Sequence, residues 1–279
     1  MIDIKDVSYS YSGINALNNI NLHIEKGEAV ALMGPNGSGK STLLKLINGI
    51  VSPEGGVYKF NNQEITHKKL QDIKFSKHFH QKIGFVFQNS DTQLFCANVF
   101  DEIAFGPRQM GINESDVDIR VNDCLNLLNI QDFKYRQPYH LSGGEKRKVA
   151  IACVLALNPE VLVLDEPMNG LDPRTQRWIV EFLIKLNKAG KTLISSTHNL
   201  ELVQEISRRA ILFDEKHTVV ADMPTEKLLE DIELLKKVNL VDEYYHRHDG
   251  NEHRHFHHVD EYYHRHDGNE HRHFHVHKF

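Results

Sequence analysis

The chain of 279 residues is long enough for one large domain or two small ones, and its formal net charge of −5 gives no reason to expect a nucleic-acid partner. Three widely spaced cysteines, Cys96, Cys124 and Cys153, predict reduced thiols rather than a disulfide framework. No apolar stretch of the sequence approaches the roughly 18–20 residues that span a bilayer, and the N-terminus lacks a signal-peptide profile. Any membrane role is therefore expected to come through a partner.

Strands and helices alternate along the first 238 residues. Strands are predicted over 2–11, 20–24, 28–33, 57–60, 82–87, 161–164, 192–197 and 210–213. Helices are predicted over 41–49, across most of 98–157, and over 173–190, 199–207 and 225–238. The short, wholly apolar segment VLVL is typical of a strand buried in a parallel sheet. The alternation therefore predicts an α/β fold.

The first chemical motif is GPNGSGKS, which has the form GxxxxGK[ST] and lies between a predicted strand and a predicted helix. Its glycines let successive backbone N–H groups turn inward around phosphates, and the N-terminus of the helix adds a favourable dipole. Lys40 is expected to reach the β- and γ-phosphates, and the hydroxyl of Ser41 to bind Mg²⁺. The motif predicts that ATP or GTP is bound by Gly34, Pro35, Asn36, Gly37, Ser38, Gly39, Lys40, Ser41 and Thr42.

A pair of carboxylates follows the predicted strand 161–164 in the segment VLVLDEP. Asp165 emerges at the carboxyl end of the strand, where it is expected to hold Mg²⁺. Glu166 stands beside it, placed to polarise an attacking water molecule as a general base. Two carboxylates at a strand end often make only a solvated corner, but after a phosphate-binding loop they predict a site of nucleotide hydrolysis.

The segment LSGGEKRKVAIA (141–152) closely resembles the signature of the ATP-binding cassette (ABC) ATPases. Ser142, Gly143 and Gly144 open a predicted helix, so their N–H groups and the serine hydroxyl form a second anion-binding terminus. The resemblance implies that two cassettes dimerise head to tail. Each ATP would then lie between the phosphate loop of one chain and the signature of the other, with ATP and Mg²⁺ as cofactors and ATP hydrolysis as the activity.

Further positions match the family in order along the chain. Gln88 resembles the Q-loop glutamine that senses Mg²⁺ or the attacking water, and residues 169–172, ending at Asp172, resemble the D-loop. His198 resembles the switch histidine that contacts the γ-phosphate. Tyr11 lies about as far before the phosphate loop as the family's adenine-stacking aromatic, and Tyr9 is the alternative. The resemblance thus implies catalytic roles for Lys40, Gln88, Glu166 and His198.

The family's fold is a P-loop (RecA-like) core with an antiparallel β subdomain and a helical subdomain that carries the signature. The resemblance places a nucleotide-binding domain over 1–225, with its helical subdomain at about 90–157. A C-terminal helix over 226–240 and a histidine-rich tail over 241–279, expected to be disordered without metal, would follow.

The segment FQNSDTQLFCANVFDEIAFGP (87–107) resembles the stretch after the Q-loop in energy-coupling factor importers, which take up vitamins or cobalt and nickel ions. Ser90 stands where proline is usual in that branch, and Met168 begins an uncommon lead into the D-loop. The resemblance implies that 89–105 lines a groove for a helix of a transmembrane partner. Phe95, Phe100 and Phe105 are candidates for that groove, and ordinary packing of the helical subdomain is the alternative.

The tail contains VDEYYHRHDGNEHRHFH twice, starting at Val241 and at Val259, and twelve of the nineteen histidines. Neutral imidazole suits Ni²⁺, Co²⁺, Zn²⁺ and Cu²⁺, so the tail is a candidate transition-metal site. Asp-Gly favours a hairpin loop. A loop at Asp249-Gly250 pairs His246 with His253, whereas a loop at Gly250-Asn251 pairs His246 with His255. The candidate ligands are His246, His248, His253, His255, His264, His266, His271 and His273.

Three functions are to be compared with these features of the sequence. The leading one is the ATPase subunit of a nickel or cobalt importer, at the cytoplasmic face of the membrane with integral coupling and substrate-binding subunits; a vitamin importer is its nearest variant. A soluble ABC ATPase of DNA repair or translation would carry a coiled-coil insertion or a second fused cassette, and the sequence has neither. A metal-buffering protein with a vestigial ATPase conflicts with intact Lys40, Asp165, Glu166 and His198.

Overall fold

The computed structural model of the chain describes residues 1–248 and 251–258. Its central element is a six-stranded sheet in the order β10-β9-β3-β8-β7-β6, in which β10 alone runs antiparallel to its neighbour. Every residue of β3, β6, β7 and β8 is buried, as the wholly apolar run of β7 predicts for a strand inside a parallel sheet. The six strands are β3 (Ala29–Met33), β6 (Ile83–Val86), β7 (Val161–Leu164), β8 (Thr192–Ser196), β9 (Arg209–Phe213) and β10 (Val219–Pro224).

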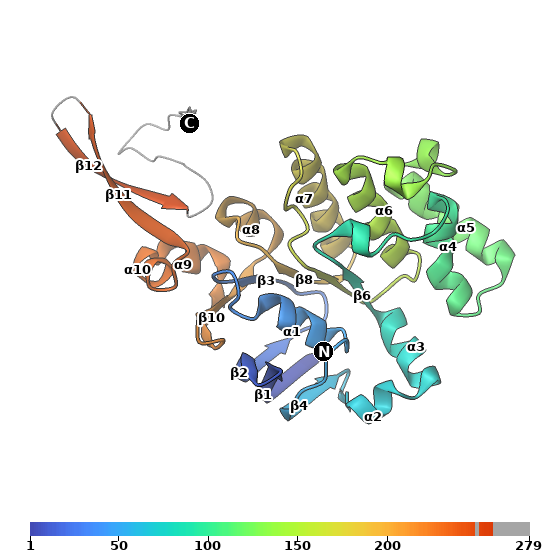
Figure 1. The fold of residues 1–279 in the computed structure, drawn as a ribbon, viewed down its shortest axis with the longest axis horizontal. Helices are drawn as coiled ribbons and strands as arrows, with labels where there is room; N and C mark the ends of the chain where they lie inside the picture. The colour runs from blue at the N-terminus through green and yellow to red at the C-terminus, as the bar shows by residue number, and fades with distance from the viewer. Residues whose placement is uncertain (249–250, 259–279) are drawn as a thin grey trace.

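A second, antiparallel sheet has the order β2-β1-β4-β5. Helix α1 (Lys40–Ile47) lies between the two sheets, and its apolar side chains share one buried cluster with residues of both (Figure 1). The helix that follows the phosphate loop is therefore packed on two sides. The strands of this sheet are β1 (Ile2–Tyr11), β2 (Ile14–Ile24), β4 (Gly55–Phe60) and β5 (Gln63–Glu64).

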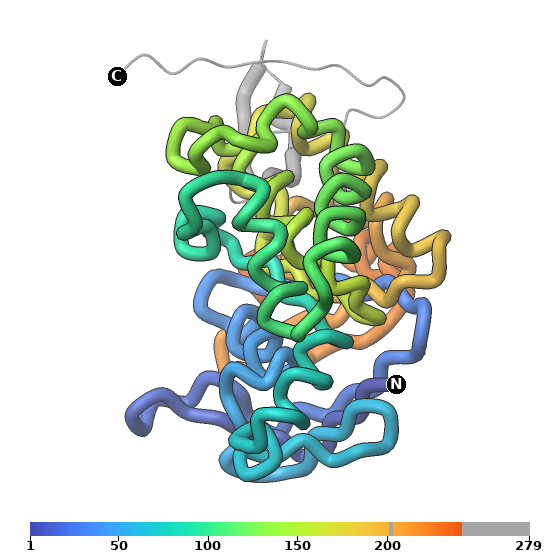
Figure 2. The backbone as a smooth tube through the Cα atoms, turned by 90° about the vertical axis from the view of Figure 1, so that its right-hand side faces the viewer, coloured from blue at the N-terminus to red at the C-terminus, as the bar shows by residue number. Residues whose placement is uncertain are grey.

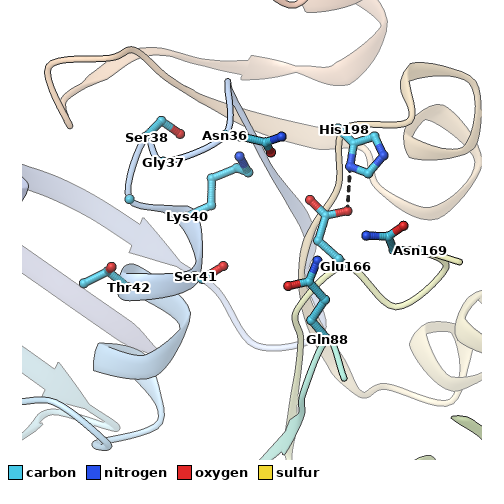
Figure 3. A pocket seen from close by; sticks show the side chains of 11 residues that line it. Asn36, Gly37, Ser38, Lys40, Ser41, Thr42, Gln88, Glu166, Asn169 and His198 are labelled. Atoms are coloured by element: carbon cyan, nitrogen blue, oxygen red, sulfur yellow. Dashed lines mark ion pairs between the residues drawn. The ribbon is translucent and has the colours of Figure 1, made fainter. Parts of the chain in front are cut away.

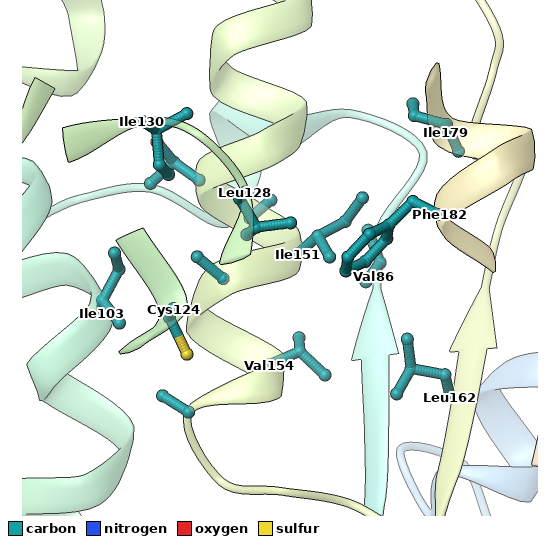
Figure 4. Packing of buried hydrophobic residues seen from close by; sticks show 14 of the residues in the cluster. Val86, Ile103, Cys124, Leu128, Ile130, Ile151, Val154, Leu162, Ile179 and Phe182 are labelled. Carbon is teal, nitrogen blue, oxygen red and sulfur yellow. The ribbon is translucent and has the colours of Figure 1, made fainter. Parts of the chain in front are cut away.

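Helices α4 (Val99–Gln109), α5 (Glu114–Leu127) and α6 (Gly143–Leu155) gather at the opposite end of the molecule from the antiparallel sheet (Figures 1 and 2). They pack with α7 (Pro173–Lys188) against β6 and β7 in a second cluster. Figure 4 shows Ile151 of α6 and Phe182 of α7 lying against Val86 at the end of β6. These helices and the two sheets confirm the predicted fold class of a P-loop α/β core with an antiparallel β part and a helical part.

The C-terminal part differs from the single helix predicted over 225–238, because the structure has two short helices, α9 (Thr225–Glu230) and α10 (Ile232–Lys237). Asp231 separates them with a non-helical backbone (φ −85°, ψ 74°), and its carboxylate accepts a hydrogen bond from the N–H of Leu234 at 3.0 Å. This N-cap satisfies a donor that a continuous helix would bond internally. With α8 (Leu200–Ile206), α9 and α10 cover β3 and β9 in a third cluster.

The tail begins with two antiparallel strands, β11 (Val241–His248) and β12 (Asn251–His258). His246 lies opposite His253 and Arg247 opposite Glu252, which is the register predicted for a loop at Asp249-Gly250. Val241 is buried in the third cluster with Leu240. The second copy of the repeat lies outside the described residues.

Two helices that the sequence patterns did not predict, α2 (His67–Leu70) and α3 (Ile73–Lys82), join β5 to β6. Helix α3 buries Phe79 alone of its residues, so it carries too thin an apolar stripe for periodicity to reveal it. Within the part of the chain that the structure describes, each helix is too short or too polar to cross a membrane.

Candidate active site

The phosphate loop joins β3 to α1 through three glycines with positive φ, namely Gly34 (142°), Gly37 (81°) and Gly39 (106°). Gly39 lies so close to the antiparallel sheet that an added Cβ would stand 2.3 Å from the carbonyl oxygen of Ala16. Glycine meets both requirements because it has no Cβ and enters the left-handed region freely. This backbone has the form in which successive N–H groups converge on a phosphate.

Lys40 stands at the start of α1 with its ammonium group directed back into the loop. Its Nζ donates hydrogen bonds to the carbonyl oxygens of Gly34 at 2.7 Å and Pro35 at 2.9 Å. Burial lowers the pKa of Lys40 from its ordinary value, and the charges of Glu166 and Asp165 raise it in part. A buried ammonium beside an open loop is a fitting partner for an anionic ligand.

A cavity of about 400 Å³ opens in front of this loop (Figure 3). The loop that follows β3 forms one wall, and residues that follow β6, β7 and β8 form the other. Parallel strands carry these segments to one edge of the sheet, the usual place for ligands in such folds. The lining residues are Asn36, Gly37, Ser38, Gly39, Lys40, Ser41, Thr42, Gln88, Glu166, Asn169 and His198.

Asp165 lies behind the cavity wall, where two hydroxyls hold one of its carboxylate oxygens. Ser41 Oγ donates to Asp165 Oδ1 at 2.9 Å, and Ser196 Oγ donates to the same oxygen at 2.7 Å. Ser196 Oγ also accepts a hydrogen bond from the N–H of Glu166 at 2.9 Å. Sequence reasoning missed Ser196, although its place at the end of a predicted strand two residues before His198 was a usable signal.

The side chains of Glu166 and His198 are in contact on the cavity wall that faces the phosphate loop (Figure 3). The Nδ1 atom of His198 lies 2.8 Å from Glu166 Oε2. Glu166 has a positive φ of 46°, which is uncommon for a residue with a side chain and marks a conformation held by its surroundings. The hydrogen bond from its N–H to Ser196 is one such restraint.

Several predicted site residues do not line this cavity. Tyr11 is 42% exposed at the end of β1, with its ring edge-to-face against Tyr9 at 4.9 Å. Asp172 caps α7 by accepting from the N–H and the hydroxyl of Thr175, and these hydrogen bonds lower the pKa of Asp172. Ser142 caps α6 in a capping box with Glu145. The other predicted nucleotide-site residues outside the lining are Gly34, Pro35, Gly143, Gly144 and Asp165.

The residues present fit a nucleoside triphosphate with magnesium. Ser38 Oγ is buried with no hydrogen-bond partner among the described residues, a rare state that a phosphate oxygen would relieve. The hydroxyl of Ser41 and the carboxylate of Asp165 are hard oxygen donors side by side, and Gln88 adds an amide oxygen from the facing wall. Phosphate and Mg²⁺ thus find matching groups on adjoining surfaces.

The predicted metal ligands of the tail have no described side chains: the structure gives only the backbone at His246, His248, His253 and His255. His264, His266, His271 and His273 lie outside the described residues. Elsewhere in the described part of the chain, no group of three or more histidine, cysteine or carboxylate side chains is arranged to hold a metal ion.

Comparison with known proteins identifies the family. The model of the ABC transporter family matches residues 17–169. A putative ABC transporter ATP-binding protein of Clostridium acetobutylicum is 53% identical over 241 residues, 86% of this chain and 100% of that protein. The nickel import ATP-binding protein LarO of Lactiplantibacillus plantarum is 48% identical over 223 residues, 80% of this chain and 92% of that protein.

Solved structures agree with these relatives. CbiO1 of Clostridium perfringens, described as part of the ABC transporter complex CbiONQ, superposes with a TM-score of 0.74 at 35% identity, over 86% of this chain and 94% of that one. A dimeric ATP-binding cassette bound to ADP and phosphate after hydrolysis superposes with a TM-score of 0.72 at 32% identity, over 81% of this chain and 99% of that one. The chain therefore belongs to the ATP-binding subunits of ABC transporters and is an ABC ATPase.

Proposed function

We propose that the chain is the ATP-hydrolysing subunit of an energy-coupling factor type importer that takes up a transition-metal ion, nickel or cobalt. The observation that carries the branch is the segment 87–107, which resembles the corresponding segment of those importers. Two further observations support the metal. A relative that is 48% identical over 223 residues is a nickel import protein, and the tail concentrates histidines that suit such ions.

In the proposed reaction Glu166 accepts a proton from the water that attacks the γ-phosphate. His198 holds the carboxylate of Glu166 in place, since its Nδ1 lies 2.8 Å from Oε2. Lys40 neutralises the phosphates from the other wall. Ser41, Gln88 and Asp165 would hold Mg²⁺, which when bound offsets the negative charge that develops on the transferred group.

The signature would act on the nucleotide of a second cassette. Ser142, Gly143 and Gly144 do not line the cavity of their own chain, so a nucleotide held there is out of their contact. A head-to-tail pair of chains would supply the missing wall, as the dimeric cassette with ADP and phosphate supports. Because each chain carries a full set of hydrolytic residues, the proposed dimer has two equivalent sites.

The variant Glu166→Gln tests both the base and the dimer. It is expected to bind ATP without hydrolysing it and to accumulate as a dimer, measured by phosphate release and by size-exclusion chromatography with ATP. Glu160→Gln, which changes a partly exposed glutamate outside the cavity, is the matched control and should behave as wild type. Turnover at the normal rate in Glu166→Gln would remove Glu166 as the base.

A membrane partner is proposed to dock where aromatic side chains are exposed in the segment 89–105. Phe95 is 67% exposed and Phe105 is 42% exposed, and their rings meet edge to face at 5.0 Å. Phe100 is only partly buried and packs against the cluster of α4–α6, with the ammonium of Lys134 5.1 Å from its ring centroid. Docking there would hold the chain at the cytoplasmic face of the membrane. Co-purification of wild type, but not of Phe95→Asp, with small membrane proteins is the expected result.

The tail is proposed to bind the transported class of ion. The register of β11 and β12 puts His246, His248, His253 and His255 at positions that share one face of the paired strands. Calorimetry of the full chain with Ni²⁺, Co²⁺ and Zn²⁺ should show heat that falls when these four residues are changed to alanine, since the second copy of the repeat keeps its own histidines. If the wild-type chain gives no heat above that of buffer, the tail does not bind these ions.

The deciding experiment is uptake of labelled nickel and cobalt in cells with the chain, without it, and with Glu166→Gln in its place. Uptake that requires the wild-type chain supports the metal importer. Unchanged metal uptake together with a lost vitamin supply would instead assign the vitamin importer. Irving–Williams ordering favours Ni²⁺ over Co²⁺ at most imidazole sites, so the choice of ion must come from this measurement.

A further inference from the structure

Arg147 lies on α6, five residues after the signature serine, and is buried with only 3% of its surface exposed. Its guanidinium donates from one terminal nitrogen to the carbonyl oxygen of Phe87 and from the other to the carbonyl oxygen of Gln88. One rigid, planar group thus holds two successive carbonyls, just where the chain leaves β6 and enters the cavity wall.

Burial of the Arg147 guanidinium is unfavourable for the free energy of folding. Among the described residues no carboxylate lies within salt-bridge distance of Arg147, and its Nε is buried without a hydrogen-bond partner. Burial lowers the pKa of Arg147, while the charge of Asp165 opposes that change. A buried cation without an ion pair is less favourable than an apolar side chain of the same volume. The buried guanidinium of Arg147 is therefore explained by the two carbonyl groups that it holds, those of Phe87 and Gln88.

Other contacts fasten the same segment to the same helix. Lys146 Nζ lies 2.6 Å from Asp91 Oδ1. The side chain of Gln93 accepts from the N–H of Phe87 at 3.2 Å and donates to the carbonyl oxygen of Ala150 at 3.3 Å. One turn after Arg147, Ile151 packs on Val86 (Figure 4). Residues 86–93 and the first turns of α6 are thus tied by hydrogen bonds, an ion pair and apolar packing.

We infer that Arg147 is a positioning residue that fixes the backbone of Gln88 to the signature helix, so that the signature and Gln88 move as one body. The inference rests on the proposed role of Gln88 in hydrolysis. Gln88 lines the cavity opposite the phosphate loop (Figure 3). Ser142 lies outside that cavity, at the start of α6. Contact between the signature and a second cassette would thereby set the distance of the Gln88 amide from the phosphates.

The test is a double-mutant cycle on Arg147→Lys and Gln88→Ala, read as the kcat and KM of ATP hydrolysis by the full chain. Lysine keeps the charge but is a single point donor and does not hold two carbonyls in a fork. We expect Arg147→Lys to lower kcat roughly 10-fold to 100-fold, the usual effect of losing a group that orients a ligand-contacting residue, with KM changed less than about twofold. In the Gln88→Ala background the same change should lower kcat by no more than about twofold.

Lys148→Gln is the matched control, because Lys148 is the next residue of the helix and its Nζ lies 4.4 Å from the ring centroid of Trp178 instead. It should leave kcat unchanged. Equal losses from Arg147→Lys in both backgrounds, or no loss in wild type, would overturn the inference while leaving Gln88 in its role. An unchanged kcat in Gln88→Ala alone would instead remove the proposed role of Gln88. If Arg147→Lys does not fold, Arg147→Met, which keeps the volume, is subject to the same expectation.

Discussion

A single hydroxyl, that of Ser196, joins the two carboxylate residues of the site, and its removal is a prediction at the scale of one residue. Ser196→Ala would leave the buried N–H of Glu166 unsatisfied and Asp165 with one hydroxyl partner fewer. An unsatisfied buried donor costs about 1–3 kcal/mol, so we expect a loss of this size in the free energy of unfolding. We also expect a fall in kcat of roughly 10-fold, since both carboxylates lose a restraint.

The neighbouring Ser195 provides the control for this variant. It is also buried in β8, but no hydrogen bond from its side chain reaches the site. Urea unfolding and phosphate release should therefore separate the two variants. Equal loss of hydrolysis in Ser195→Ala and Ser196→Ala would mean that the strand, and not the hydroxyl of Ser196, sets the position of Glu166.

Two glycines of the phosphate loop are predicted to respond unequally to the same substitution. Gly37→Ala meets no atom within 4 Å and faces only its positive φ, a cost of about 1 kcal/mol. Gly39→Ala would set a Cβ 2.3 Å from the carbonyl oxygen of Ala16, so the loop or β2 must shift. Thermal unfolding without nucleotide should show a small change in Tm for Gly37→Ala and a large one for Gly39→Ala. Similar changes would contradict the close approach.

At the scale of elements, α4 anchors the segment before it through one buried carboxylate. Glu102 is 3% exposed, and its Oε2 accepts from the N–H of Phe95 at 2.8 Å and of Cys96 at 2.6 Å. Burial raises the pKa of Glu102, and these two hydrogen bonds lower it in part. The folded state thus holds the proton to higher pH than the unfolded state, so this group's contribution to stability is present at low pH. That contribution is lost as the pH rises from about 4.3 through the folded pKa.

Glu102→Gln tests this sign, because glutamine keeps an acceptor oxygen and does not titrate. Urea unfolding at several pH values between 4 and 8 should show that the free energy of unfolding of the variant increases relative to that of wild type as the pH rises. The pH dependence of the difference in free energy of unfolding between variant and wild type reports the titration of Glu102. The size of that difference at any one pH also includes the new contacts of the amide. A difference that stays constant, or moves the other way, would show that the pKa of Glu102 is not raised in the folded chain.

Elements with a strong local signal were predictable from sequence, and those held by tertiary contacts were not. The apolar run at 161–164 predicted a buried strand, and the glycines at 34, 37 and 39 predicted the loop between β3 and α1. Helix α3 was missed because one buried phenylalanine carries its packing. The break between α9 and α10 was not predicted, because the amphipathic pattern continues through Asp231. In the structure this residue caps the second helix.

The site shows the same division. Motif order predicted which residues gather at the carboxyl ends of the strands, since parallel strands bring them there. The hydroxyl of Ser196 and the fork of Arg147 were not predicted, because each acts on backbone atoms or on a carboxylate brought near only by folding. Nor does one chain place Ser142 beside Lys40, since that contact is proposed to lie between two molecules.

At the scale of the whole molecule, the third buried cluster sets where the chain is expected to tolerate truncation. Val238, Leu240 and Val241 are buried in that cluster with Met33, the residue before the phosphate loop. A chain ending at residue 237 loses three buried apolar side chains, each worth about 1.5–3 kcal/mol. Its Tm should fall by on the order of 10 °C. A chain ending at residue 241 keeps the cluster and should match the full chain in Tm and in ATP hydrolysis. Equal Tm values for both truncations would contradict this role of the cluster.

Carbonyl dipoles, rather than an opposite charge, hold the guanidinium of Arg147, and this has a consequence for the ionic environment of the protein. Mobile ions weaken attraction between exposed charges over a Debye length of about 8 Å at physiological salt, so the nearby pair of Lys146 with the 66% exposed Asp91 weakens as salt rises. Counter-ions do not reach the buried guanidinium of Arg147. The part of the tie that Arg147 makes should therefore keep its strength over a wide range of ionic strength, while the part made by Lys146 and Asp91 does not.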